Sequence, residues 1–211
     1  MQLVKPGYQK VVDEIAGFAW SELDQNELLA VAQAYYYFSV QFCETVEIAC
    51  RKYPNDERLF ELRDGECNTD NLSPFPGIAE PGEKLNHDEF MRRTLAISSL
   101  SSEQRARIDR LGASYLAQVR RTDEDTRIMS LPAYEDGGLE AVFSAVLHAR
   151  DWDQPALRAF RHFLIGHVKL DSDPEYGHGS LCRHLVPDDR IIPLWTAFRD
   201  ILVEAAPKLL H

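Results

Sequence analysis

The sequence lacks long hydrophobic runs and has few cysteines, and these absences exclude several classes of protein. None of its apolar stretches approaches the ~18 residues that a transmembrane helix needs, so we expect no membrane span. The first ten residues lack the basic and then apolar layout of a secretion signal, which favours a cytoplasmic location. The four cysteines form no Cys-x-x-Cys pair, and we interpret them as reduced, buried thiols.

Positive charge is also scarce. The chain has 23 lysines and arginines against 34 aspartates and glutamates, for a net charge of −11. Because phosphate groups bind clustered basic side chains, nucleic acid is not an expected partner. Hydrophobic residues make up 45% of the 211 residues, which is enough for a sizeable core and too many for a disordered chain. We therefore expect one globular domain that spans residues 1–211.

Helical periodicity dominates the chain. In residues 26–52, apolar side chains such as Leu29, Ala32 and Tyr36 recur at three- and four-residue steps, as one buried helix face requires. Prolines and glycines cluster at 71–82 and indicate a loop, and no alternating run bounded by hairpin turns suggests a strand. The sequence predicts an all-α bundle of seven or eight helices, over residues 8–20, 26–52, 56–64, 87–97, 103–121, 139–149, 156–170 and 193–208.

Histidines concentrate in residues 161–185, which hold four of the seven in the chain. His167 and Asp171 lie four positions apart, so on a helix they share a face and can bind one metal ion. A break after Asp171 allows His178 to fold back toward the same point. Imidazole and carboxylate ligands suit iron, manganese or zinc. The alternative is a histidine-rich helix end that an Asx turn caps.

Three other residues are candidates because of where they fall in the helical pattern. Glu66 ends one predicted helix, His87 begins the next, and Glu140 lies in an otherwise apolar helix. Each also has a simpler interpretation. His87 can be a surface side chain, and Glu140 can be a first-turn carboxylate that complements the helix dipole.

Together, the order of these residues resembles the heme-oxygenase-like diiron oxidases. The shared pattern is a glutamate that ends a helix, a histidine that opens one, a distant glutamate, and then His-x3-Asp with a later histidine. In that family three histidines and three carboxylates from core helices hold two irons. The resemblance implies a heme-oxygenase-like helical bundle, with metal ligands at Glu66, His87, Glu140, His167, Asp171 and His178.

The last motif departs from the family pattern. The family usually has His-x3-Asp-x2-His, whereas here His178 follows Asp171 by seven residues, so His184 is an alternative third histidine. Glu44 and Glu47 are alternative or additional carboxylates, because some family members take a ligand from this helix. Their other interpretation is a solvated pair on one helix face.

The family resemblance also implies a function. It indicates a nonheme diiron oxidase or oxygenase with two Fe(II) per chain, O2 as cosubstrate, and manganese as an alternative metal. The expected substrate is a small carboxylate-bearing metabolite, an amino acid or a fatty acid, in a natural-product pathway. The reaction would be N-oxygenation, C–C cleavage, desaturation or decarboxylation, and an external electron donor is compatible with all of them.

Two other functions remain open at this point. The first is a metal-independent enzyme, related to the thiaminase-like and cofactor-independent oxidase branches of the same superfamily, which would need Cys43 or Cys67 at a pocket for nucleophilic chemistry. The second is a non-enzymatic helical interaction protein. In that case residues 191–210 are a candidate contact of a homodimer, and the candidate ligand segments would lie far apart.

Overall fold

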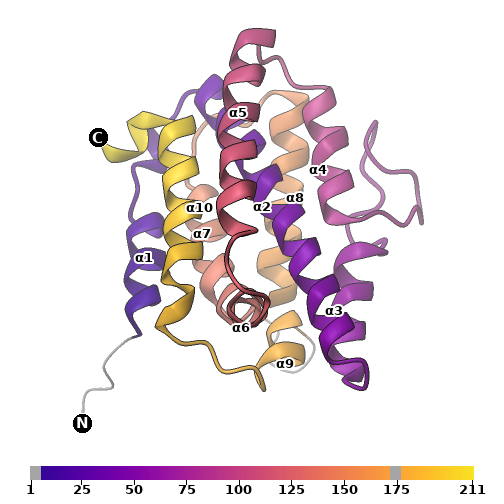
Figure 1. Ribbon diagram of the computed structural model, residues 1–211. Coiled ribbons are helices and arrows are strands. Elements are labelled where there is room, and N and C mark those ends of the chain that lie inside the picture. Colours follow the sequence, from indigo (N-terminus) through magenta and orange to yellow (C-terminus); the bar gives the residue numbers. More distant parts are fainter. Residues whose placement is uncertain (1–5, 172–176) are drawn as a thin grey trace.

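The computed structural model describes residues 6–171 and 177–211, except for the side chains of Leu170 and Asp171 (Figure 1). The prediction of an all-α fold is confirmed, since this part of the chain contains ten α-helices, three short 3-10 helices and no β-strand. The α-helices are α1 (Gly7–Ala16), α2 (Gln25–Lys52), α3 (Glu57–Cys67), α4 (His87–Ala96), α5 (Ser102–Val119), α6 (Glu124–Glu135), α7 (Gly138–Val146), α8 (Pro155–Asp171), α9 (His178–Cys182) and α10 (Ile192–Ala205).

Helix α2 runs through the middle of the bundle, behind α5 in the view of Figure 1. It has 28 residues and begins with a capping box, in which Asp24 accepts a hydrogen bond from the backbone of Glu27 and the Glu27 side chain accepts one from Asp24. Six helices pack against it, namely α3, α4, α5, α6, α8 and α10. Residues on most sides of α2 are therefore buried.

Aromatic side chains fill the core beside α2. The rings of Phe38 and Phe198 have centroids 4.4 Å apart, and Tyr35 lies 5.4 Å from both Phe143 and Phe163. Such pairs contribute roughly 0.5–1.5 kcal/mol beyond their buried area. The aromatic cluster continues to His167, whose ring stacks on Phe163 at 4.1 Å. The hydrophobic core thus forms one wall of the polar cluster described below.

Two helices were not predicted from the sequence. Helix α6 contains Pro132, a residue that usually marks a helix boundary, and α9 has only five residues; neither helix is among those predicted above. A proline removes one backbone hydrogen bond from a helix, and burial of nearly all the residues of α6 from Thr126 to Glu135 offsets that loss. The chain turns from α6 into α7 at Gly137, whose φ of 97° favours glycine.

The loop between α3 and α4 returns to its starting point. The backbones of Thr69 and Leu85 exchange two hydrogen bonds, of 3.2 and 2.8 Å, and so join the two ends of the loop. This bridge brings the start of α4 beside the end of α3. As a result, His87 lies next to Glu66 although the two residues are 21 positions apart.

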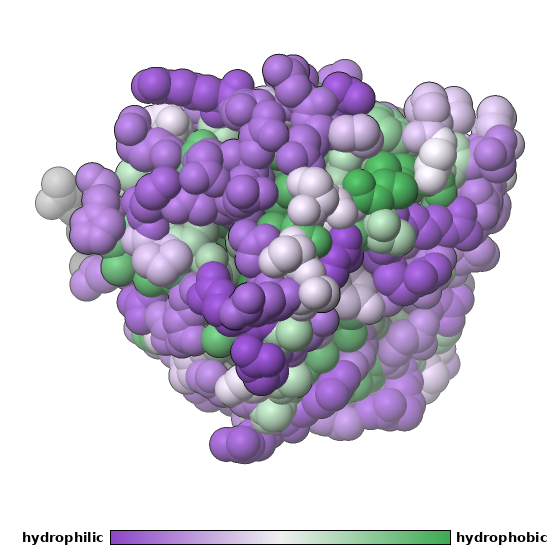
Figure 2. Space-filling view, turned by 90° about the horizontal axis from the view of Figure 1, so that it is seen from above, coloured by the Kyte–Doolittle hydropathy of each residue, from purple (hydrophilic) through white to green (hydrophobic). Residues whose placement is uncertain are grey.

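The surface shows no large apolar area on the face seen in Figure 2, where hydrophobic side chains form small areas separated by hydrophilic ones. The large exposed hydrophobic residues of the described part of the chain are scattered along the sequence, at Tyr53, Ile97, Val186 and Leu210. Within residues 6–171 and 177–211, every helix is too short or too polar to cross a lipid bilayer.

Candidate metal centre

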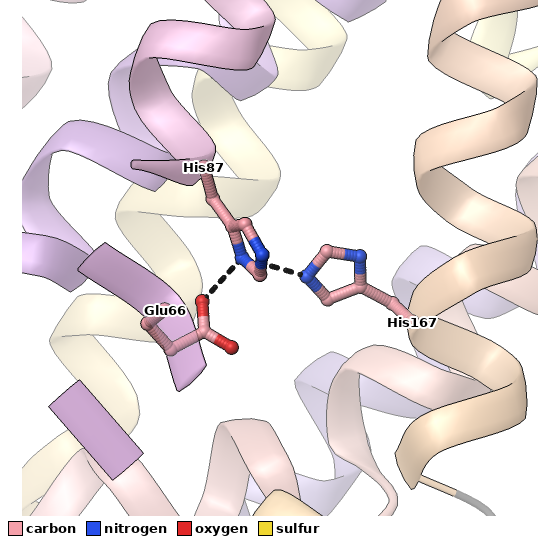
Figure 3. Close-up of side chains that lie close together, drawn as sticks. All are labelled: Glu66, His87 and His167. Carbon is pink, nitrogen blue, oxygen red and sulfur yellow. Dashed lines mark hydrogen bonds and ion pairs between the residues drawn. The ribbon is translucent and has the colours of Figure 1, made fainter. Parts of the chain in front are cut away.

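Three predicted ligands from separate helices meet in the interior of the bundle (Figure 3). Glu66 comes from the end of α3, His87 from the start of α4 and His167 from α8. The Glu66 Oε2 and His87 Nδ1 atoms are 2.5 Å apart, and His167 Nε2 lies 3.1 Å from His87 Nδ1. All three side chains are buried, with exposed fractions of 5% or less. Three atoms that can each donate a lone pair to a metal therefore point at one another.

A second group of three shares Glu66 with the first. His178 Nδ1 lies 2.7 Å from Glu66 Oε1 and 3.3 Å from Glu135 Oε2, and all three residues are buried. One oxygen of Glu66 thus faces His87 and the other faces His178. A carboxylate placed in this way is suited to bridge two metal ions, as in the dimetal sites of helical bundles.

Several atoms of the centre have no hydrogen-bond partner. Glu66 Oε1, Glu135 Oε2 and His178 Nδ1 are buried and face one another at 2.7 and 3.3 Å, but their contacts do not have hydrogen-bond geometry. An unsatisfied buried polar atom costs about 1–3 kcal/mol, and more when it is charged. A metal cation among these atoms would satisfy all three, so the residues present fit a metal ion.

The orientation of His167 also fits a metal ligand. Its Nδ1 donates a hydrogen bond of 2.9 Å to the backbone carbonyl of Phe163. Because a neutral imidazole has one N–H, this bond leaves the lone pair on Nε2, the atom that faces Glu66 and His87. Metal-binding histidines are commonly fixed by a bond of this kind.

Burial and mutual charge strongly shift the pKa values of the carboxylates. Burial would raise the pKa of Glu66, but the neighbouring His87 and His178 outweigh it and hold that pKa below its ordinary value. Burial raises the pKa of Glu135, and the negative charge of Glu66 adds to the rise. The centre thus contains one carboxylate that stays ionised, Glu66, beside one that is protonated more easily, Glu135.

The histidines are shifted in opposite directions. Burial, together with the charge of His87, lowers the pKa of His167 to about 3, so this side chain is neutral near pH 7. For His178, burial would lower the pKa, but Glu66 and Glu135 outweigh it and raise the pKa to about 11. In the metal-free protein a proton on His178 therefore takes the place of part of the positive charge that a metal would supply.

Two glycines allow α9 to bring His178 into the centre. A Cβ atom at position 65 would lie 2.7 Å from His178 Nε2, and one at position 179 would lie 2.9 Å from the backbone oxygen of Glu135. Both positions therefore permit an approach that a larger residue would block. Beyond α9, Arg183 pairs with Asp136 at 2.8 Å. Helix α9 is in this way wedged between α3 and α6.

Glu140 is not brought into either group of three, and Glu135 stands there instead. Glu140 lies half-buried in the first turn of α7, beyond the glycine turn, whereas Glu135 ends α6 and is buried. We missed Glu135 because we did not predict α6. The available signal was the N-cap Asp123, followed by apolar residues Ile128 and Leu131 three positions apart.

The remaining predicted ligands have other outcomes. Asp171 lies at the end of α8, and its side chain falls outside the described residues. His184 pairs with Asp56 at 2.7 Å, at the start of α3 and apart from the centre. Glu44 forms ion pairs with Arg120 and Arg127, and these two arginines compensate its negative charge. Helix α2 thus contributes no carboxylate to the two groups found among the described residues.

Several cavities adjoin the centre, and two of them are lined by His167. A narrow internal cavity is lined by Glu66, His87, Glu135 and His167 together with Tyr35, Phe38, Ser39, Phe42, Cys43, Leu139 and Phe163. A wider groove of about 420 Å³ is also lined by His167. It is lined by Asn71, Leu72, His162, Ile165, Gly166, His167 and Lys169. His167 lines both the groove and the internal cavity.

The two glutamates near the α6–α7 turn allow a matched test. Glu135→Gln keeps the size of the side chain but weakens a candidate ligand, so we expect weaker metal binding at the group of Glu66, Glu135 and His178. Outer-sphere partners contribute roughly 10–100-fold to metal affinity, and the loss here should be at least that large. Glu140→Gln should bind as the wild type does. Equilibrium dialysis with metal analysis measures both, and equal binding by the two variants would contradict the assignment.

Metal binding should also release protons. His178, with its pKa raised to about 11 from 6.5, holds a proton from neutral pH up to that value, and a metal ligand must lose it. We therefore expect affinity to rise with pH between about 7 and 10, with proton release that is smaller in His178→Ala. Calorimetry in buffers of different ionisation enthalpy counts the protons. The same release from the wild type and from His178→Ala would exclude His178 as the source.

Comparisons with protein-family models, curated proteins and solved structures find no match. The resemblance to the heme-oxygenase-like diiron oxidases therefore stays a prediction from the sequence. The geometry of the two buried groups is the basis for the metal centre.

Proposed function

We propose that this protein is a nonheme diiron oxidase or oxygenase that uses O2 to oxidise a small carboxylate-bearing metabolite. One observation carries the proposal: Glu66 belongs to two buried groups of three candidate ligands, and each of its oxygens faces a different histidine. A single metal site would need only one of these groups. The shared carboxylate favours a pair of ions.

The chemistry of the ligands favours iron. The two groups together offer three imidazoles and two carboxylates, with no thiolate among them. This mixture of nitrogen and oxygen ligands suits iron and manganese, whereas thiolates are typical of structural zinc sites. Two reduced irons would supply electrons for the reduction of O2, and an external donor would restore them after each turnover.

The apolar wall of the internal cavity also supports oxidative chemistry at the centre. The internal cavity is walled by Tyr35, Phe38, Phe42 and Phe163, all of them buried, and the carboxylates and imidazoles lie at one side of it. An apolar wall excludes water and keeps reactive species from side reactions. The cavity measures only about 10 Å³, so the proposed role of its apolar wall is to keep water away from the metals.

The wider groove lined by His167 suits the substrate. Leu72 and Ile165 give it apolar sides, while Lys169 brings positive charge and His162 a second nitrogen-bearing side chain. Apolar sides with a cationic group match a molecule with a hydrocarbon part and a carboxylate. An amino acid and a fatty acid both meet this description.

A metal-independent enzyme is a second candidate, because Cys43 lines the internal cavity together with Glu66 and His87. A thiol at this place could act as a nucleophile. However, a hydrogen bond with Cys67 and burial raise the pKa of the Cys43 thiol well above its ordinary value, which disfavours the reactive thiolate. The non-enzymatic alternative required separated ligand segments, and the structure brings those of Glu66, His87, His167 and His178 together.

The proposed function is tested by anaerobic titration with Fe(II), followed by exposure to O2. We expect about two irons per wild-type chain and a new absorption band on adding O2. His167→Ala should lose iron affinity by ~100-fold or more, because a direct ligand contributes more than the outer-sphere partners. His162→Ala is a matched control, since this residue lies on the same helix and its ring bonds to the carbonyl of Leu72 instead.

Three results distinguish the candidates. Absence of iron binding by the wild type, or equal binding by His167→Ala and His162→Ala, contradicts the diiron centre. Turnover that persists in metal-free protein and disappears in Cys43→Ala would support the metal-independent enzyme. Iron binding with no change on exposure to O2 would remove the oxidase function but keep the metal site.

A further inference from the structure

Asn71, in the loop after α3, bonds at both ends of its side chain. Its Nδ2 donates a hydrogen bond of 3.2 Å to the backbone carbonyl of Gly65, and its Oδ1 lies 3.2 Å from His87 Nε2. A carbonyl oxygen can only accept, so the contact with Gly65 fixes which end of the amide carries the N–H groups. Oδ1 of Asn71 must then accept, and His87 Nε2 must donate.

This direction of hydrogen bonding determines the orientation of His87. With a proton on Nε2, the lone pair of a neutral ring lies on Nδ1, 2.5 Å from Glu66 Oε2 and 3.1 Å from His167 Nε2. His167 Nε2 also carries a lone pair, because its Nδ1 donates to Phe163. In this neutral form three lone-pair atoms converge, and either a proton on His87 Nδ1 or a metal cation in its place removes their mutual repulsion.

We propose that Asn71 is a positioning residue that fixes the tautomer of His87, so that Nδ1 faces the metal. The inference rests on the proposed metal centre and adds a residue that lies outside both groups of ligands. Asn71 is exposed at the surface, where an asparagine is ordinarily replaceable, yet both ends of its amide are engaged. It links the backbone next to one ligand, Glu66, to the ring of another.

The loop holds Asn71 in place for this role. The backbone N–H of Asn71 donates to the Thr69 hydroxyl at 3.2 Å, and Thr69 itself is joined to Leu85 by two backbone bonds. Leu85 is two residues from His87, so the same bridge positions the asparagine and the start of α4. Asn71 and His167 line the same groove, so a molecule bound there would lie beside Asn71.

The test uses Zn(II) as a diamagnetic probe in the full chain. Asn71→Leu keeps the size of the side chain and removes both polar ends, while Asn71→Asp keeps an acceptor for His87 and loses the donor to Gly65. Asn86→Leu is the matched control, because Asn86 precedes His87 and its side chain makes no cap hydrogen bond. NMR of ¹⁵N-histidine-labelled protein reports the tautomer of His87, and chelator competition reports Zn(II) affinity.

We expect Nδ1 coordination with a protonated Nε2 in the wild type, in Asn71→Asp and in Asn86→Leu. Asn71→Leu should bind the ion next to His87 roughly 10–100-fold more weakly, as for other outer-sphere partners, and should lose the single tautomer. Thermal melting of each metal-free variant separates this effect from loss of folding.

Several outcomes would overturn the inference. They are an unchanged tautomer and affinity in Asn71→Leu, an Asn71→Asp variant as weak as Asn71→Leu, or an equal loss in Asn86→Leu. These outcomes leave the proposed function in place as long as the wild type binds metal. Failure of the wild type itself to bind Zn(II) or Fe(II) would instead remove the proposed centre, and the role of Asn71 with it.

Discussion

The buried carboxylate of Glu66 is the constraint on which the rest of the structure depends. An ionised carboxylate in a helix-bundle interior costs several kcal/mol unless positive charge or hydrogen bonds compensate it. Here its two oxygens face His87 and His178, and the charge of these two residues outweighs burial to keep the pKa of Glu66 low. The lone-pair atoms around it, with those of His167 and Glu135, form the surroundings that a pair of cations requires.

The helices are arranged to meet this constraint. The bridge between Thr69 and Leu85 returns the chain from α3 to α4, and the small residues Gly65 and Gly179 let α9 enter between α3 and α6. On the other side, the aromatic core beside α2 reaches His167 through Phe163. The same packing that stabilises the bundle therefore orients the ligands and provides an apolar cavity beside them. The aromatic core therefore both positions the candidate metal ligands and forms the apolar wall beside them.

The sequence predicted much of this arrangement and missed one part. Periodicity identified the long helix of residues 26–52 with little error, and the helix ends marked Glu66 and His87, because caps and periodicity are local signals. Pro132 concealed α6, so we chose Glu140 in place of Glu135. Tertiary burial decides whether a proline is tolerated in a helix, and periodicity does not report burial. The return of His178 was predicted from the break after Asp171 and from the family resemblance. Its partners, Glu66 and Glu135, depend on glycine contacts that no local pattern reveals.

The most direct test of the account is anomalous X-ray diffraction from crystals grown with iron and, separately, with manganese. The account predicts two anomalous peaks roughly 3.5–4 Å apart, one among Glu66, His87 and His167 and the other among Glu66, Glu135 and His178. Both should lie within coordination distance of Glu66. A single peak that does not contact Glu66, or no peak at either group in crystals soaked in excess metal, would contradict it.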